Sequence, residues 1–91
     1  MGFNAEQLDA IDQAVTHLIV RGDPLVPSLR EQFPGVMFVR CSARDMSEQP
    51  YRNHERYQLH LLDRREHCVQ VTLQPENADG VIIAEYGANH G

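Results

Sequence analysis

The stretch YQLHLLDRREHCVQVTL, residues 57–73, decides the fold because apolar and polar residues alternate along it twice. Alternation with a period of two is typical of a strand that buries one of its faces. The apolar rows are Tyr57, Leu59 and Leu61 in the first run, and Val69, Val71 and Leu73 in the second. These runs predict the two strands of an antiparallel hairpin.

The register of this hairpin follows if both apolar rows must lie on one face of the sheet. We expect Leu61 opposite Val69 and Leu59 opposite Val71, because a slip of one residue would send one row to the other face. This register requires an odd number of loop residues, and we favour five, residues 63–67. His60 and Cys68 then share the second face.

The N-terminal part of the chain predicts two helices. Asn4 and Gln7 have the spacing of a capping box for the first helix, and Gly22 is suited to end it. The second helix is shorter, starts within residues 23–27 and ends before Pro34. The apolar stripe of the first helix is Leu8, Ile11, Val15, Leu18 and Ile19, and we place Asp9 and Asp12 on its exposed side.

Two further strands are predicted, over residues 36–41 and 81–86. Residues 81–84 are apolar without alternation, so this strand is either central in the sheet or covered on its second face. Residues 42–55 form a long polar connection between the first strand and the hairpin. We therefore expect a single α+β domain over residues 1–91, with two N-terminal helices packed on one face of a four-stranded antiparallel sheet.

Composition excludes several function classes. The net charge of −5 argues against non-specific binding to nucleic acid, which depends on a basic surface. The chain has no lysine, so a Schiff base, a pyridoxal-phosphate anchor and a P-loop lysine are all excluded. We expect no nucleic-acid partner and no cofactor.

The cellular setting is inferred from the apolar segments. No basic stretch followed by an apolar stretch begins the chain, and no apolar run approaches the roughly 20 residues that span a bilayer. We expect a cytoplasmic protein that does not engage a membrane, with the general character of a small bacterial protein. In a reducing compartment its two cysteines are expected to be free thiols.

Cys41, His60 and Cys68 are the candidate ligands for a small metal or redox site. Thiolate and imidazole are the ligands that zinc and copper(I) prefer, and His60 and Cys68 share a face of the predicted hairpin. The spacing lacks a C-x₂-C or H-x₃-H pair. The alternative is that both cysteines fill space in the core.

A cysteine nucleophile is a third hypothesis. Arg40 and Arg44 flank Cys41 in sequence and could lower the pKa of its thiol. Neither cysteine follows a glycine-rich turn or opens a predicted helix, which are the usual settings of a nucleophilic thiol.

Residues 51–57 interleave aromatic and cationic side chains. Such a segment could stack single-stranded bases or bind a phosphopeptide, with Tyr51, Arg52, His54 and Arg56 as the binding residues. The alternative, which we prefer, is that tyrosine packs over the sheet while the arginines stay in water.

The interpretation that we favour is a small intracellular protein-interaction or accessory module without enzymatic activity. We expect its partner to be a protein, either another chain or a second copy of itself. The reason is the last strand, because its second apolar face needs cover and a second copy could supply part of it.

Overall fold

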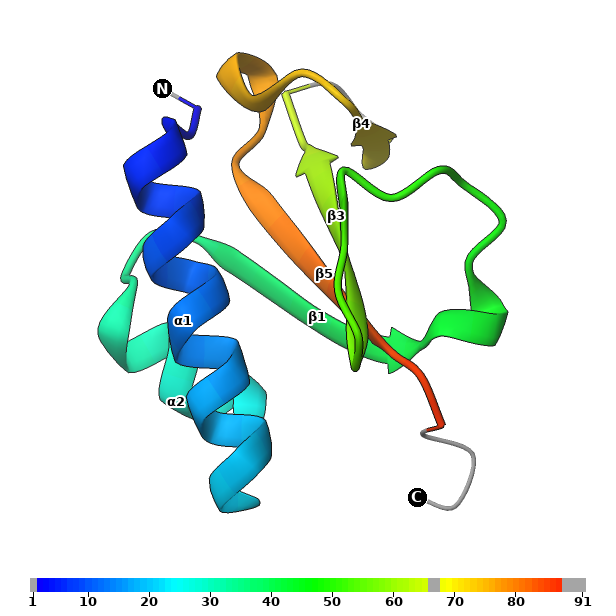
Figure 1. Ribbon diagram of the computed structural model, residues 1–91. Coiled ribbons are helices and arrows are strands. Elements are labelled where there is room, and N and C mark those ends of the chain that lie inside the picture. The colour runs from blue at the N-terminus through cyan, green and yellow to red at the C-terminus, as the bar shows by residue number, and fades with distance from the viewer. Residues whose placement is uncertain (1, 66–67, 88–91) are drawn as a thin grey trace.

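The computed structural model describes residues 2–65 and 68–87 and has an α+β fold. Figure 1 shows two helices on one side of a twisted sheet and a long connecting segment on the other. The elements are α1 (Ala5–Arg21), α2 (Leu25–Gln32), β1 (Met37–Ser42), η1 (Ala43–Asp45), β2 (Arg52–Asn53), β3 (Tyr57–Asp63), β4 (Gln70–Thr72), η2 (Pro75–Asn77) and β5 (Gly80–Glu85).

The helices begin and end largely as the sequence predicts. Asn4 and Gln7 form the expected capping box, and Gly22 ends α1 in the left-handed conformation with φ 76°. α2 starts at Leu25, inside the predicted range, with Pro24 at its N-cap and no side chain capping it. Asp23 pairs with Arg21, at 3.0 Å between carboxylate and guanidinium.

The sheet is mixed, so the prediction of a four-stranded antiparallel sheet is wrong in strand number and direction. The strand order is β1-β5-β3-β2, β1 runs parallel to β5, and β4 pairs with β3 beside β2. Residues 81–84 are apolar on both faces, which suits β5 for the central place between β1 and β3. The Met37 N–H donates to the Asp79 carbonyl at 3.3 Å, so β1 and β5 start at the same end.

The predicted hairpin register is also wrong. Leu59 pairs with Ile83 and Leu61 with Val81, both on β5, whereas β4 reaches only the end of β3 and places Val71 opposite Leu62. Central β5 supplies the same-face apolar partners that the predicted hairpin assigns to residues 69 and 71. Val69 and Leu73 are consequently 53% and 49% exposed.

The hairpin loop differs in length as well. β3 ends at Asp63 and β4 begins at Gln70, so six residues separate them instead of the predicted five. Residues 66 and 67, at the centre of this loop, lie outside the described residues.

The main core lies between the helices and one sheet face. Alternation in β3 is confirmed, because Tyr57, Leu59 and Leu61 all point into this core. β1 contributes Phe38, and β5 contributes Val81 and Ile83. The helices contribute Leu8, Ile11, Val15, Leu18, Leu25 and Leu29.

A second, smaller core lies on the other face of the sheet. Ala43 and Met46, from the segment that follows β1, pack there against Leu62, Ile82 and Ala84. The chain thus provides its own cover for the second face of β5, where Ile82 and Ala84 are only 9% and 0% exposed. A second copy is not needed at that place.

Candidate functional site

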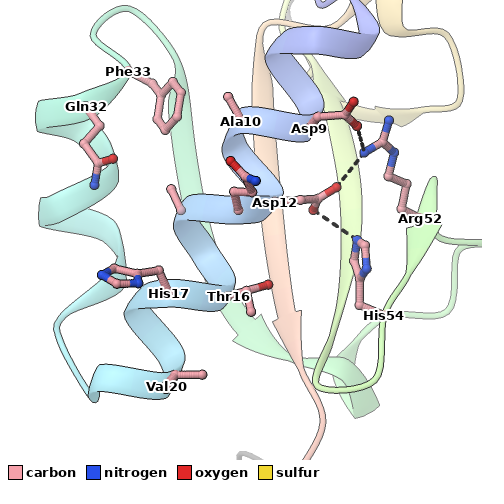
Figure 2. A pocket seen from close by; sticks show the side chains of 12 residues that line it. Asp9, Ala10, Asp12, Thr16, His17, Val20, Gln32, Phe33, Arg52 and His54 are labelled. Atoms are coloured by element: carbon pink, nitrogen blue, oxygen red, sulfur yellow. Dashed lines mark hydrogen bonds and ion pairs between the residues drawn. The ribbon is translucent and has the colours of Figure 1, made fainter.

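A polar cluster joins α1 to β2 and β3, and Asp12 is at its centre (Figure 2). One oxygen of the Asp12 carboxylate accepts from Arg52 Nη1 at 2.7 Å, and the other accepts from the Tyr57 hydroxyl at 2.5 Å. His54 Nε2 lies 3.1 Å from that second oxygen. Asp9, one turn earlier on α1, also accepts from Arg52 Nη1, at 2.9 Å. Both oxygens of the Asp12 carboxylate are therefore occupied by the protein itself.

Burial sets the electrostatics of this cluster. It raises the pKa of the Tyr57 hydroxyl well above its usual range, and the hydrogen bond to the Asp12 carboxylate adds to the rise. The His54 ring lies against the Tyr57 ring, with 4.7 Å between centroids. Since Arg52 is held by two carboxylates and Tyr57 stays protonated, the cluster is suited to fixing β2 and β3 against α1.

The prediction that Asp12 lies on the exposed side of α1 is wrong, because Asp12 is only 9% exposed. A signal was present in the sequence. Asp12 follows Leu8 by four residues and precedes Val15 by three, so it lies within the apolar stripe. An acidic residue in such a stripe needs a buried partner, and here the partners are Tyr57 and Arg52.

A groove of about 990 Å³ follows the outer surface of α1. Figure 2 shows Arg52 and His54 on one flank of the helix, and Gln32, Phe33 and His17 on the other. The charged groups that it offers are already paired, because Arg52 is bound by Asp9 and Asp12. The groove is open to solvent.

The four predicted binding residues are only partly brought together. Arg52 and His54 meet at Asp12 and line the groove. Tyr51 lies beside Arg52, whose guanidinium carbon is 6.0 Å from the tyrosine ring centroid. Arg56 lines a separate cavity of about 220 Å³ together with His54 and Tyr57.

The three predicted metal ligands belong to different segments, with Cys41 on β1, His60 on β3 and Cys68 before β4. Cys41 pairs with Ala84 and His60 with Ile82, from opposite sides of β5, so strand geometry puts their Cα atoms on the order of 12 Å apart. Cys68 is exposed and precedes β4. Within residues 2–65 and 68–87, no three His, Cys, Asp or Glu side chains are grouped to hold a metal ion.

The thiol of Cys41 lacks the setting of a nucleophile. Burial raises its pKa, and the negative charge of Asp45 raises it further. Arg40, one of the two candidate cations for lowering this pKa, instead pairs with Glu85 at 2.9 Å.

His60 is fully buried on the second face and belongs to a chain of hydrogen bonds. Its Nε2 lies 2.8 Å from Gln58 Oε1, and Gln58 Nε2 donates to the Tyr86 hydroxyl at 3.0 Å. Tyr86 in turn donates to Asn53 at 2.6 Å. Burial lowers the pKa of His60, so its ring is neutral at neutral pH, and its Nδ1 has no partner among the described residues.

Residues 8–86 match the model of a family of unknown function (DUF6129). No curated protein and no solved structure matches the chain. Among the described helices, none combines the length and the apolar character needed to cross a bilayer.

Proposed function

Since the chain belongs to DUF6129, a family of unknown function, we propose from its structure that it is a non-enzymatic protein-interaction module that associates with itself. The observation that carries this proposal is the outer edge of β1, the edge that faces away from β5. Within the described residues no strand pairs with it. Unpaired strand edges are templates for pairing with another chain.

The hydrogen-bonding groups on this edge can be assigned from the ladder between β1 and β5. Met37 directs its N–H to β5, so in a parallel ladder Val39 and Cys41 do the same. Phe38, Arg40 and Ser42 then direct their main-chain N–H and C=O groups outward. None of these three N–H groups has a main-chain partner in the described part of the chain.

The outer edge of β1 lacks the features that commonly prevent pairing. It contains no proline, no lysine and no break in its register with β5 over Met37–Ser42. Its one charged side chain, Arg40, is turned to Glu85 in the same sheet. Apolar side chains flank the edge on both faces and are only partly buried: Val36 on the helix side, and Met37, Val39 and Cys41 on the other.

This proposal is favoured over a metal or redox site on Cys41, His60 and Cys68 because Cys41 and His60 lie on opposite sides of β5 and no three such side chains are grouped within the described residues. It is favoured over a cysteine-nucleophile enzyme because burial raises the pKa of the better candidate thiol. The cytoplasm is the proposed location, and a protein is the proposed partner, with no nucleic acid or membrane involved.

Two substitutions at one position test the proposal. Arg40→Pro removes an outward N–H, and the ladder to β5 does not use that group; edge strands tolerate proline at such places. Arg40→Ala keeps the N–H and removes only the side chain, so it is the matched control. Light scattering should find a dimer for the wild type and for Arg40→Ala, and a folded monomer for Arg40→Pro. A wild type that stays monomeric up to millimolar concentration would refute the proposal.

A further inference from the structure

We infer that the partner on the outer edge of β1 is the same edge of a second copy, paired antiparallel and centred on Val39. This inference rests on the proposed function, because it names the partner and the register for the proposed interface. The product is one continuous sheet that runs through both copies.

The antiparallel orientation follows from symmetry. A two-fold axis perpendicular to the sheet makes two β1 strands antiparallel and keeps the helices of both copies on one side. A two-fold axis along the strand makes them parallel and puts the helices on opposite sides. Only the first arrangement extends each apolar face of the sheet into the same face of the partner.

If each apolar face is to continue into the same face of the partner, odd-numbered residues of β1 must lie opposite odd-numbered residues of the partner's β1. The odd residues of β1 are the half-buried apolar ones of the second face, Met37, Val39 and Cys41. Centring the pair on Val39 puts Val39 opposite the partner's Val39 and Met37 opposite the partner's Cys41. One apolar row then continues across the junction.

Two registers meet this condition near the middle of the strand, one centred on Val39 and one centred on Arg40. The even-numbered residues select between them. Centring on Arg40 would set Arg40 opposite the partner's Arg40, and like charges opposite one another destabilise a sheet. Centring on Val39 sets Phe38 opposite the partner's Arg40. Phe38 and Arg40 carry the outward N–H and C=O groups, so each such pair exchanges both main-chain hydrogen bonds.

The other free edge is less suited to a symmetric pair. It is formed by two short strands, β2 with two residues and β4 with three, against the six of β1. The exposed Val69 on this side precedes β4. This second edge is therefore the natural comparison in the test.

Disulfide trapping in solution distinguishes the registers. The starting protein carries Cys41→Ala and Cys68→Ser, so it has no cysteine, and its mass is first measured by light scattering. Three variants of it are then compared: Val39→Cys, Arg40→Cys and Val69→Cys. In the inferred register, residue 39 of one copy lies opposite residue 39 of the other in a non-hydrogen-bonded pair. The two Cα atoms are about 4.5 Å apart, which is within disulfide range. The two residues at position 40 would be roughly 8 Å apart, too far for a disulfide.

We expect Val39→Cys to form a covalent dimer under mild oxidation at least tenfold faster than either other variant. Faster trapping by Arg40→Cys would overturn the register, and faster trapping by Val69→Cys would move the interface to β4. A dimer by light scattering with no fast trapping at any position would overturn the inference and leave the proposed function standing. If the starting protein and the wild type are both monomeric, the inference and the proposed function are both overturned. If only the wild type is dimeric, the three variants are compared in a protein that retains Cys41 and carries only Cys68→Ser, and the same outcomes decide.

Discussion

At the scale of single residues, Asp12 is the polar side chain on which the contact between helix and sheet depends most. It is 9% exposed and accepts hydrogen bonds from Arg52 and Tyr57. Asp9 contacts the same Arg52 nitrogen, but its side chain is 69% exposed. Asp12 is the buried partner of Arg52 and Asp9 the exposed one, so they form a natural pair for substitution.

Asp12→Ala should lower the free energy of unfolding by roughly 2 to 4 kcal/mol, because it leaves the Tyr57 hydroxyl buried without an acceptor and removes one carboxylate from Arg52. Asp9→Ala should cost less than about 1 kcal/mol, because an exposed ion pair contributes little. Urea unfolding of both variants measures the difference. Equal losses would mean that the cluster does not fix the sheet against α1.

Tyr57 gives a pH dependence on the alkaline side. Its pKa is raised in the folded protein, so the folded state keeps a proton that the unfolded state loses above its ordinary pKa of about 10. Stability from this group is fully present below that pH and is lost as the pH rises above it. The chain has no lysine to obscure this range. Tyr57→Phe should unfold with a flatter dependence on pH between 9 and 11 than the wild type, as urea unfolding at several pH values measures.

The two thiols should differ in reactivity. Cys41 is partly buried and its pKa is raised, whereas Cys68 is exposed. At neutral pH a bulky thiol reagent should therefore label the Cys41→Ser protein, which retains Cys68, at least tenfold faster than the Cys68→Ser protein. Fast labelling of Cys41 in the folded chain would restore the hypothesis of a cysteine nucleophile.

At the scale of elements, the pairing of β3 with β5 predicts which apolar side chains matter. Leu61 is fully buried opposite Val81, whereas Val69 is 53% exposed before β4. Leu61→Ala should cost about 2 to 5 kcal/mol, as buried leucines do, and Val69→Ala less than about 0.5 kcal/mol. Thermal unfolding compares them. A large loss for Val69→Ala would favour the register predicted from the hairpin alone.

Local signals in the sequence were sufficient for the helices and for the faces of β3. The capping box at Asn4 and the left-handed residue Gly22 depend on neighbours only, and α1 begins and ends beside them. Alternation in β3 likewise reports which side chains are buried, since that depends on the pleat of a single strand. His60 could thus be assigned to the second face, but its complete burial could not be foreseen.

At the scale of the whole molecule, strand order could not be predicted because it depends on contacts that are distant in sequence. The apolar character of residues 81–84 allowed either a central strand or a covered one, and the structure has both. β5 is central, and Ala43 and Met46 cover its second face. The site was equally non-local, since Asp12 meets Arg52 and Tyr57 from 40 and 45 residues away.

The central claim is that the outer edge of β1 is paired in solution, and amide hydrogen exchange by NMR tests it most directly. The N–H groups of Phe38 and Arg40 point away from β5, whereas that of Val39 is bonded within the sheet and serves as an internal control. We predict that the Phe38 and Arg40 amides exchange slowly, and that their protection increases with protein concentration while that of Val39 changes little. Fast exchange of Phe38 and Arg40 at every concentration, with Val39 protected, would contradict the account.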